Sequence, residues 1–285
     1  MTVGLAVPFP GGSILCADSR VDANGRTTPG DDSPALMSVT AGRRMFAITF
    51  AAQDPRAGSM LASEIATVAC ASPNRADVVP GIKRVMGDWF RSYGIAQVPA
   101  MQFLVASNSS DDNAGRVLLC EPPSTVMDTF GPCVIGSGSR SVSSMLRLLA
   151  PRTGNAASSL RSTVLRMTYL MHLARRSDPK SVGEDTEMVV LSNRGSFFYI
   201  DRAELQQAEG LGEKVDALLL DMARQVLSAE PEENPQTIAE EFLRGYFEVM
   251  EQNPQVYFPS LSYLDRATAA GPVPVPPQSH TGTHG

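Results

Sequence analysis

The sequence predicts an α+β protein with four layers, in which two antiparallel β-sheets are stacked and helices cover both outer faces. Three observations support this fold class. Strand patterns occur in runs, helix patterns follow them, and the same order occurs twice along the 285 residues. A strict alternation of strand and helix would instead favour a single parallel sheet. We therefore expect an α-β-β-α sandwich.

Four strand patterns precede the first helix pattern. Prolines and glycines at residues 8–12 supply the turn of a hairpin between the first two strands. A segment rich in Gly, Asp, Thr and Pro at residues 21–33 is typical of a loop and separates this hairpin from the next two strands. The four expected strands span residues 2–7, 13–18, 35–39 and 45–51.

The apolar residues then change to a helical period. Asp54 before Pro55 is typical of a helix start, because aspartate accepts hydrogen bonds from free N–H groups and proline is favoured at the first helical position. Apolar residues at helical spacing predict one helix after this start and a second helix over residues 78–93.

The same order returns after residue 100. Three strands are expected first, then a Gly-Ser-Gly-Ser turn at residues 136–139, two helices and two closing strands. The strands span residues 101–106, 116–120, 133–135, 186–192 and 196–201, and the helices span residues 141–150 and 156–175.

The C-terminal part of the chain lies beyond this repeated pattern. It holds two amphipathic helix patterns, at residues 211–226 and 238–250, and a Pro-rich polar tail that cannot build a core. We expect a main domain over residues 1–205, a helical extension over 206–267 and a disordered tail over 268–285. The apolar faces of the extension either cover the main domain or bridge neighbouring subunits.

Charge and composition exclude several kinds of partner. The formal net charge of -6 argues against a surface for nucleic acid or for anionic membranes. No stretch approaches the roughly 18 apolar residues of a membrane-spanning helix. Prolines and glycines interrupt the early apolar stretch, unlike in a secretion signal, and the four cysteines form no C-x-x-C pair. We therefore expect a cytoplasmic protein with reduced thiols.

Thr2 is the first candidate for catalysis. Removal of Met1 would leave a residue that carries both a nucleophilic hydroxyl and a free α-amine. The amine has an unperturbed pKa of about 7.7–8.0, so near neutral pH it can accept the proton of the hydroxyl. Threonine is also common in strands, and the residue type alone leaves both interpretations open.

Three motifs resemble the N-terminal-nucleophile (Ntn) hydrolases of the proteasome β-subunit group. In the first, Gly-Gly joins two strands and Ala17-Asp18-Ser19-Arg20 ends the second. Ile135-Gly136-Ser137-Gly138 is similar to the Gly-Ser-Gly turn of these subunits, and Asp178-Pro179-Lys180-Ser181 has their Asp-x-x-Ser spacing before a strand. Ser181-Val182-Gly183 resembles the bacterial peptidases described as ancestral β-subunits. The likeness covers about residues 2–203.

The resemblance implies a role for each matching residue. Thr2 matches the nucleophile, and its amine matches the proton acceptor. Asp18 matches the carboxylate that orients and charges the site, with Arg20 as a structural partner nearby. The group that surrounds the amine and holds its ordered water corresponds to Ser137, Asp178 and Ser181. The backbone N–H that stabilises the oxyanion would lie near Ala52.

The sequence departs from the family at two places. The spacing of the catalytic lysine, counted from Thr2, leads to about Pro34, and the first lysine of the chain is Lys83. Arginines are present earlier, but a guanidinium with a pKa above 12 cannot carry a proton. Ala51 and Ala52 replace glycines of the oxyanion turn. Besides a threonine peptidase, the sequence therefore allows a non-catalytic subunit that scaffolds assembly, or a small-amide hydrolase or acylase on the same fold.

Each motif also has a purely structural interpretation. Asp18 and Asp178 fit ordinary turns or caps, and residues 136–139 fit a flexible turn with a helix cap. His172 lies in an apolar helix pattern that is typical of a core or interface histidine. The two histidines of the tail have no acidic or Cys partner nearby, so we expect no metal and no organic cofactor.

The resemblance further implies partners. It implies polypeptide substrates and self-assembly into a ring or a related homo-oligomer that encloses the sites. An ATP-dependent unfoldase is a possible partner that the sequence leaves open.

Overall fold

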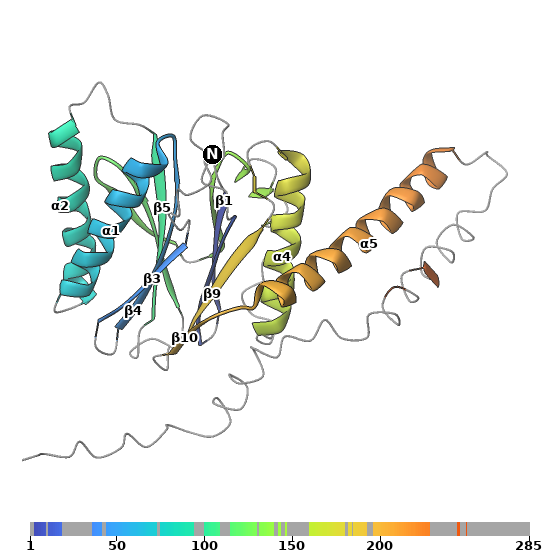
Figure 1. Cartoon of the computed structure of the whole chain (residues 1–285), viewed down its shortest axis with the longest axis horizontal. Helices are drawn as coiled ribbons and strands as arrows, with labels where there is room; N and C mark the ends of the chain where they lie inside the picture. The colour runs from blue at the N-terminus through green and yellow to red at the C-terminus, as the bar shows by residue number, and fades with distance from the viewer. Residues whose placement is uncertain are drawn as a thin grey trace, which may run out of the picture.

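The protein consists of two stacked five-stranded antiparallel sheets with helices on both outer faces (Figure 1). The computed structural model describes residues 3–9, 11–18, 36–41, 44–72, 75–93, 100–108, 115–129, 131–139, 142–143, 146, 160–179, 182–183, 185–192, 196–228, 244–245 and 249. Within these ranges the predicted fold class is confirmed, because the layers follow the order helix, sheet, sheet, helix.

The first sheet has the strand order β10-β9-β2-β1-β8, and every neighbouring pair is antiparallel. The predicted turn at residues 8–12 is shorter than expected, since Pro8 and Phe9 pair with β2. Proline is tolerated there because β8 pairs only with Val3 to Ala6. The strands are β1 (Val3–Phe9), β2 (Gly12–Asp18), β8 (Cys133–Gly136), β9 (Thr186–Ser192) and β10 (Ser196–Tyr199).

The second sheet has the strand order β3-β4-β5-β6-β7. Its edge strand β7 was not predicted from the sequence. Thr125, Met127 and Asp128 in this strand are exposed, so its residues carry little of the apolar signal that reveals a buried strand. The strands are β3 (Leu36–Ala41), β4 (Arg44–Ala52), β5 (Met101–Ser107), β6 (Arg116–Glu121) and β7 (Thr125–Thr129).

The helices α1 (Pro55–Ala71) and α2 (Arg75–Tyr93) cover the second sheet, and α4 (Leu160–Ser177) and α5 (Arg202–Ser228) lie on the side of the first (Figure 1). The predicted start of α1 is confirmed, because Asp54 Oδ1 accepts hydrogen bonds from the N–H groups of Arg56 and Ala57. Most of the helix predicted at residues 141–150 lies outside the described residues, and residues 142, 143 and 146 are helical.

Three apolar clusters fill the spaces between the four layers. Strand β2 contributes side chains to two of these clusters. Ile14 and Cys16 point toward α4, whereas Leu15 and Ala17 point toward the second sheet. Because side chains alternate along a strand, Asp18 falls on the side of α4. This alternation decides where the candidate site forms.

Helix α5 runs across the boundary that we expected at residue 205. Leu205 and Ala208, in its first turns, are buried in the cluster between the first sheet and α4. Its later turns extend away from the sheets (Figure 1) and expose Leu219 and Leu220. The predicted tail at residues 268–285 lies outside the described residues.

Two further expectations concern the thiols and membranes. Cys16, Cys70, Cys120 and Cys133 are all free, as expected, with Cys16 and Cys120 buried. Among the described helices, none combines the length and the apolar character that crossing a membrane requires.

Candidate active site

Asp18, the last residue of β2, joins three segments of the chain. Its side chain is fully buried. Its Oδ1 accepts a hydrogen bond from the backbone N–H of Val3 at 3.0 Å, and its Oδ2 accepts one from the N–H of Gly183 at 2.7 Å. The carboxyl group therefore connects the start of β1 to the loop after α4, which an ordinary turn or cap residue would not do.

The environment of Asp18 shifts its ionisation. Burial raises the pKa of Asp18 to about 7, and the hydrogen bonds from Gly183 and Val3 lower the pKa by less than burial raises it. In the part of the chain that the structure describes, no lysine or arginine forms a salt bridge with this carboxyl group. Near neutral pH Asp18 therefore occurs in both its protonated and its ionised form.

The Gly-Ser-Gly turn lies against the same point of β1. Gly136 pairs with Val3 in the sheet, and its φ of 93° is a backbone conformation that favours glycine. A Cβ atom on Gly138 would lie 2.3 Å from Cγ2 of Val3 and 3.3 Å from Cγ2 of Val182. Both glycines are therefore needed for packing against β1, beyond any role in an ordinary turn.

Ser137 lies between these two glycines. Its Oγ is buried and has no hydrogen-bond partner among the described residues. Ser13 in β2 and Thr49 in β4 share this property. A buried hydroxyl without a partner is unfavourable, so the Ser137 hydroxyl is a candidate for contact with a water molecule or a substrate.

The turn after α4 brings the third predicted motif to Asp18. The N–H of Asp178 donates to the carbonyl of Ala174 at 3.0 Å, and the carbonyl of Asp178 accepts from the N–H of Val182 at 3.0 Å. Val182 is buried, and the N–H of the next residue donates to Asp18. Asp178 thus shapes this loop through its backbone.

The structure therefore brings together three of the predicted site segments. Asp18, the turn that contains Ser137, and the loop that begins at Asp178 all meet around Val3. The other predicted site residues, Thr2, Arg20 and Ser181, lie outside the described residues, as does Pro34.

Ala52 lies in the second sheet, at the end of β4. Its side chain is buried in the cluster under α1, next to Phe50, and its Cβ lies 2.7 Å from the position that a Cβ on Gly58 would take. No hydrogen bond joins it to Asp18 or Ser137 in the described part of the chain. Its side chain thus serves the packing of β4 against α1.

The residues that hold Asp18 in place were not predicted from the sequence. The bond from Gly183 spans 165 residues, and only the resemblance of the Ser181-Val182-Gly183 motif drew attention to this loop. Arg175 Nε donates to the carbonyl of Gly183 at 2.6 Å. A basic residue in the last turn of a helix is an ordinary feature, so no signal in the sequence distinguishes Arg175 from its neighbour Arg176.

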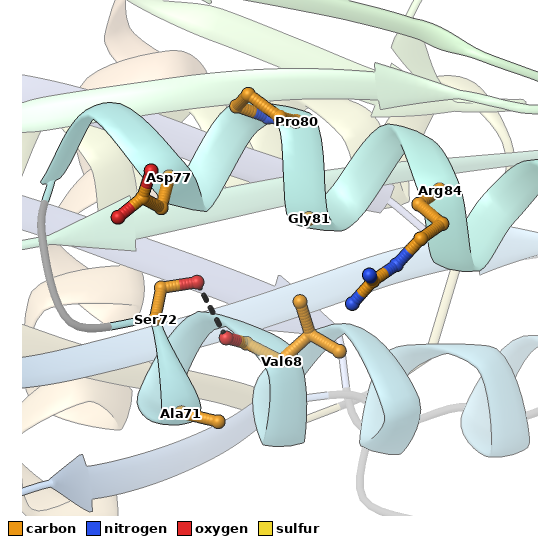
Figure 2. Close-up of a pocket in the computed structure, with 7 residues that line it drawn as sticks. All are labelled: Val68, Ala71, Ser72, Asp77, Pro80, Gly81 and Arg84. Carbon is orange, nitrogen blue, oxygen red and sulfur yellow. Dashed lines mark hydrogen bonds between the residues drawn. The ribbon is translucent and has the colours of Figure 1, made fainter.

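A separate cleft lies between α1 and α2 in the opposite outer layer (Figure 2). Arg84 extends from α2 into it, and the Ser72 hydroxyl at the end of α1 donates to the carbonyl of Val68 at 2.8 Å. None of the three unpaired hydroxyls of the described residues lies in its lining. The lining consists of Val68, Ala71, Ser72, Asp77, Pro80, Gly81 and Arg84. The residues around Asp18 are therefore the stronger candidate for catalysis.

Metal binding finds no support in the described ranges, where no three His, Cys, Asp or Glu side chains lie close enough together to bind a metal ion. His172 is buried, and its Nε2 lies 3.2 Å from Asp216 Oδ2. It is therefore a core histidine with a polar partner, as its place in the apolar helix pattern predicted.

Two solved structures share the fold. One is Anbu (ancestral beta-subunit) from Yersinia bercovieri, with a TM-score of 0.62 and 13% sequence identity. The other is the Anbu (Gly-1) mutant from Hyphomicrobium sp. strain MC1, with a TM-score of 0.60 and 15% identity. Each alignment covers 82% of this chain and 100% of the other chain. No protein-family model and no curated protein matches the sequence.

These matches define the class of fold. The two antiparallel sheets between helix layers are similar to the proteasome-like fold of the Anbu proteins. At identities of 13% and 15%, the likeness shows the fold alone, and the chemistry has to be inferred from the residues around Asp18.

Proposed function

We propose that this chain is a threonine peptidase of the proteasome β-subunit type, with Thr2 as its nucleophile after removal of Met1. One observation carries the proposal. Asp18, the Gly-Ser-Gly turn and the loop at residues 182–183 meet around Val3, the residue that follows Thr2 in the chain. The likeness of the fold to the two Anbu structures supports the same class.

The proposed reaction uses the two functional groups of one residue. The Thr2 hydroxyl attacks a peptide carbonyl and passes its proton to the α-amine of Thr2. The amine returns the proton to the leaving nitrogen, and water then hydrolyses the ester. In this scheme the unpaired Ser137 hydroxyl holds the water, and a backbone N–H near Ala52 stabilises the oxyanion. Asp18 anchors the chain next to the nucleophile.

The remaining predicted residues support this site in the same proposal. Asp178 and Ser181 surround the amine together with Ser137, and Arg20 supports the loop after Asp18. The reaction requires no metal and no organic cofactor, since the hydroxyl, the amine and the water supply all the groups that react.

A non-catalytic scaffold subunit is the second candidate. Two observations favour it. The chain has no lysine before Lys83, and both oxygens of Asp18 accept hydrogen bonds from the backbone. In this alternative Asp18 and the Gly-Ser-Gly turn only fasten β1 to the loop after α4.

One experiment separates the candidates. The intact mass of the purified full chain is measured first, and the chain is then treated with an inhibitor directed at N-terminal threonine. The peptidase proposal expects loss of Met1, modification of Thr2, and peptide turnover that the variant Thr2→Ala abolishes. Retention of Met1, or turnover that survives Thr2→Ala, would contradict the proposal. Turnover of small amides but not of peptides would identify an acylase.

We further propose that the chain forms a homo-oligomer in the cytoplasm and acts on polypeptides, with an ATP-dependent unfoldase as a possible partner. The Anbu likeness supports this proposal, and so do the exposed Leu219 and Leu220 on the outer turns of α5. Light scattering after size-exclusion chromatography tests it, because a monomer at working concentration would contradict an enclosed site.

A further inference from the structure

Both backbone polar groups of Gly183, the residue whose N–H donates to Asp18, form hydrogen bonds with side chains. The N–H of Gly183 donates to Asp18 Oδ2 at 2.7 Å, and the carbonyl of Gly183 accepts a hydrogen bond from Arg175 Nε at 2.6 Å. Gly183 is buried, so its carbonyl depends on a protein donor. The position of the donor to Asp18 therefore depends on where the Arg175 guanidinium lies.

The guanidinium is in turn held by two other elements. Its Nη1 donates to Glu209 Oε2 on α5 at 2.8 Å, and its Nη2 donates to Thr186 Oγ1 on β9 at 3.0 Å. Thr186 Oγ1 donates to Glu209 Oε1 at 2.6 Å. A planar guanidinium with all three nitrogens bonded has one orientation.

These hydrogen bonds lead back to Asp18 through the first sheet. Thr186 is the residue of β9 that pairs with Asp18 of β2. Arg175 therefore connects the strand next to Asp18, the loop that donates to Asp18, and α5. The side chains of Arg175 and Glu209 are 19% and 12% exposed, so water screens their pairing much less than it screens a surface pair.

A second polar cluster attaches α5 to α4. Asp216, about two helical turns beyond Glu209, accepts hydrogen bonds from the Tyr169 hydroxyl at 2.7 Å and from Arg176 Nη1 at 2.6 Å. Its Oδ2 also lies 3.2 Å from His172 Nε2. Two acidic residues of one helix thus each pair with an arginine of α4, and of these two it is Glu209 whose arginine bonds Gly183.

We propose that Arg175 is a positioning residue of the candidate active site, and that Glu209 of α5 orients it. In this way α5 determines how firmly the Gly183 peptide holds Asp18. The meaning of this arrangement for catalysis rests on the proposed peptidase function, whereas the arrangement itself is measurable without any activity.

The test compares two matched variants of the full chain, Glu209→Ala and Asp216→Ala. Each removes an acidic partner of an α4 arginine from the same helix. Hydrogen exchange followed by mass spectrometry reports on the peptides that contain Val3 and Gly183. We expect Glu209→Ala to speed exchange at both places about tenfold or more, and Asp216→Ala to change it less than about twofold while it speeds exchange in α5.

Arg175→Lys provides a second probe, because lysine keeps the charge but cannot bond Gly183, Glu209 and Thr186 together. We expect it to act like Glu209→Ala on the exchange of Gly183, and thermal unfolding shows that each variant is folded. Unchanged exchange at Gly183 in Glu209→Ala would overturn the proposal, and so would an equal effect of Asp216→Ala, which would indicate simple loosening of α5.

Activity is measured separately so that the two proposals stay distinguishable. If the chain is a peptidase, Glu209→Ala lowers kcat with little change in KM, because the residue acts on the site and not on the substrate. If wild-type protein shows no turnover, the proposed function fails, and the exchange result still decides whether Glu209 and Arg175 position the Gly183 peptide.

Discussion

Two buried aspartates of this protein, Asp18 and Asp216, show how the partner of a carboxyl group decides its charge. Both have little exposure to solvent. Asp18 receives only backbone N–H groups among the described residues, and burial raises its pKa to about 7. Burial also raises the pKa of Asp216, but hydrogen bonds from Tyr169, Arg176 and His172 lower this pKa by more than burial raises it, so that the net shift is downward.

The difference separates a structural carboxylate from a group with a variable charge. Asp216 stays ionised near neutral pH and fastens α5 to α4 through a charged partner. Asp18 changes its protonation in the range where the α-amine of an N-terminal residue also titrates. Shifted pKa values are common at functional sites. Asp18 has such a pKa, and the turn that contains the unpaired Ser137 hydroxyl packs against Val3, whose N–H donates to Asp18.

The largest effect should come from deleting each carboxyl group. Asp18→Ala leaves the buried N–H groups of Val3 and Gly183 without a partner, which costs about 2–6 kcal/mol at about 1–3 kcal/mol for each donor. Asp216→Ala should cost less, about 1–3 kcal/mol, because Tyr169 is only partly buried and Arg176 is 48% exposed, so both can bind water instead and His172 alone is left as a buried partner. Urea unfolding measures both free energies. A larger loss of unfolding free energy in Asp216→Ala than in Asp18→Ala would contradict this order and show that the polar cluster between α4 and α5 contributes more to stability.

The next effect is a packing change next to Asp18. Gly138→Ala puts a Cβ 2.3 Å from Cγ2 of Val3, and overpacking of this kind costs about 1–3 kcal/mol. The displaced Val3 should weaken its bond to Asp18, so exchange of the Val3 amide should rise. Gly210→Ala in α5 is the control, because no atom lies within 4 Å of its new Cβ. This substitution should stabilise the helix by about 0.5–1 kcal/mol. Equal stability of the two variants would contradict the close packing at Gly138.

The last effect is a difference in pH dependence, where the two carboxyl groups are compared by the sign of the change. The pKa of Asp18 is higher in the folded protein than its ordinary value of 3.8, so the folded state binds more protons and the unfolding free energy falls as the pH rises from about 4 to about 7. The pKa of Asp216 is lowered, so its contribution is present above about pH 4 and is lost in acid.

Unfolding followed from pH 3 to pH 8 checks these opposite signs. Asp18→Ala should remove the fall between pH 4 and 7, and Asp216→Ala should reduce the loss in acid. The same slope in both variants would mean that the two carboxyl groups do not differ in the way that their partners indicate.

Local patterns made much of the fold predictable. Asp54-Pro55 marked the start of α1, and period-two and helical patterns located most strands and helices. The Gly-Ser-Gly turn was recognisable by its resemblance to a family motif, and the structure shows that its glycines allow the backbone to approach β1 closely. Strand β7 was not predicted, because an exposed edge strand does not need the apolar alternation that reveals buried strands.

Such local patterns could not predict the hydrogen-bond partners of Asp18. Asp18 itself was recognisable at the end of a strand, but its bond to Gly183 joins residues far apart in the chain. Backbone N–H groups are the same in every non-proline residue, so nothing in the sequence marks the N–H of Val3 or Gly183 as a donor. Arg175 and Glu209 also look like ordinary charged residues of two helices.

The sequence by itself determined the order of the elements, the four layers and the positions of Asp18 and of the Gly-Ser-Gly turn, since these depend on local periodicity and on backbone conformations that few residues adopt. The tertiary structure alone decided that, among the described residues, Asp18 has backbone N–H groups as its partners and Ser137 has none, and that α5 reaches the Gly183 loop through Arg175. These features depend on contacts between distant segments, and packing, rather than any neighbouring residue in the chain, fixes the distances between them.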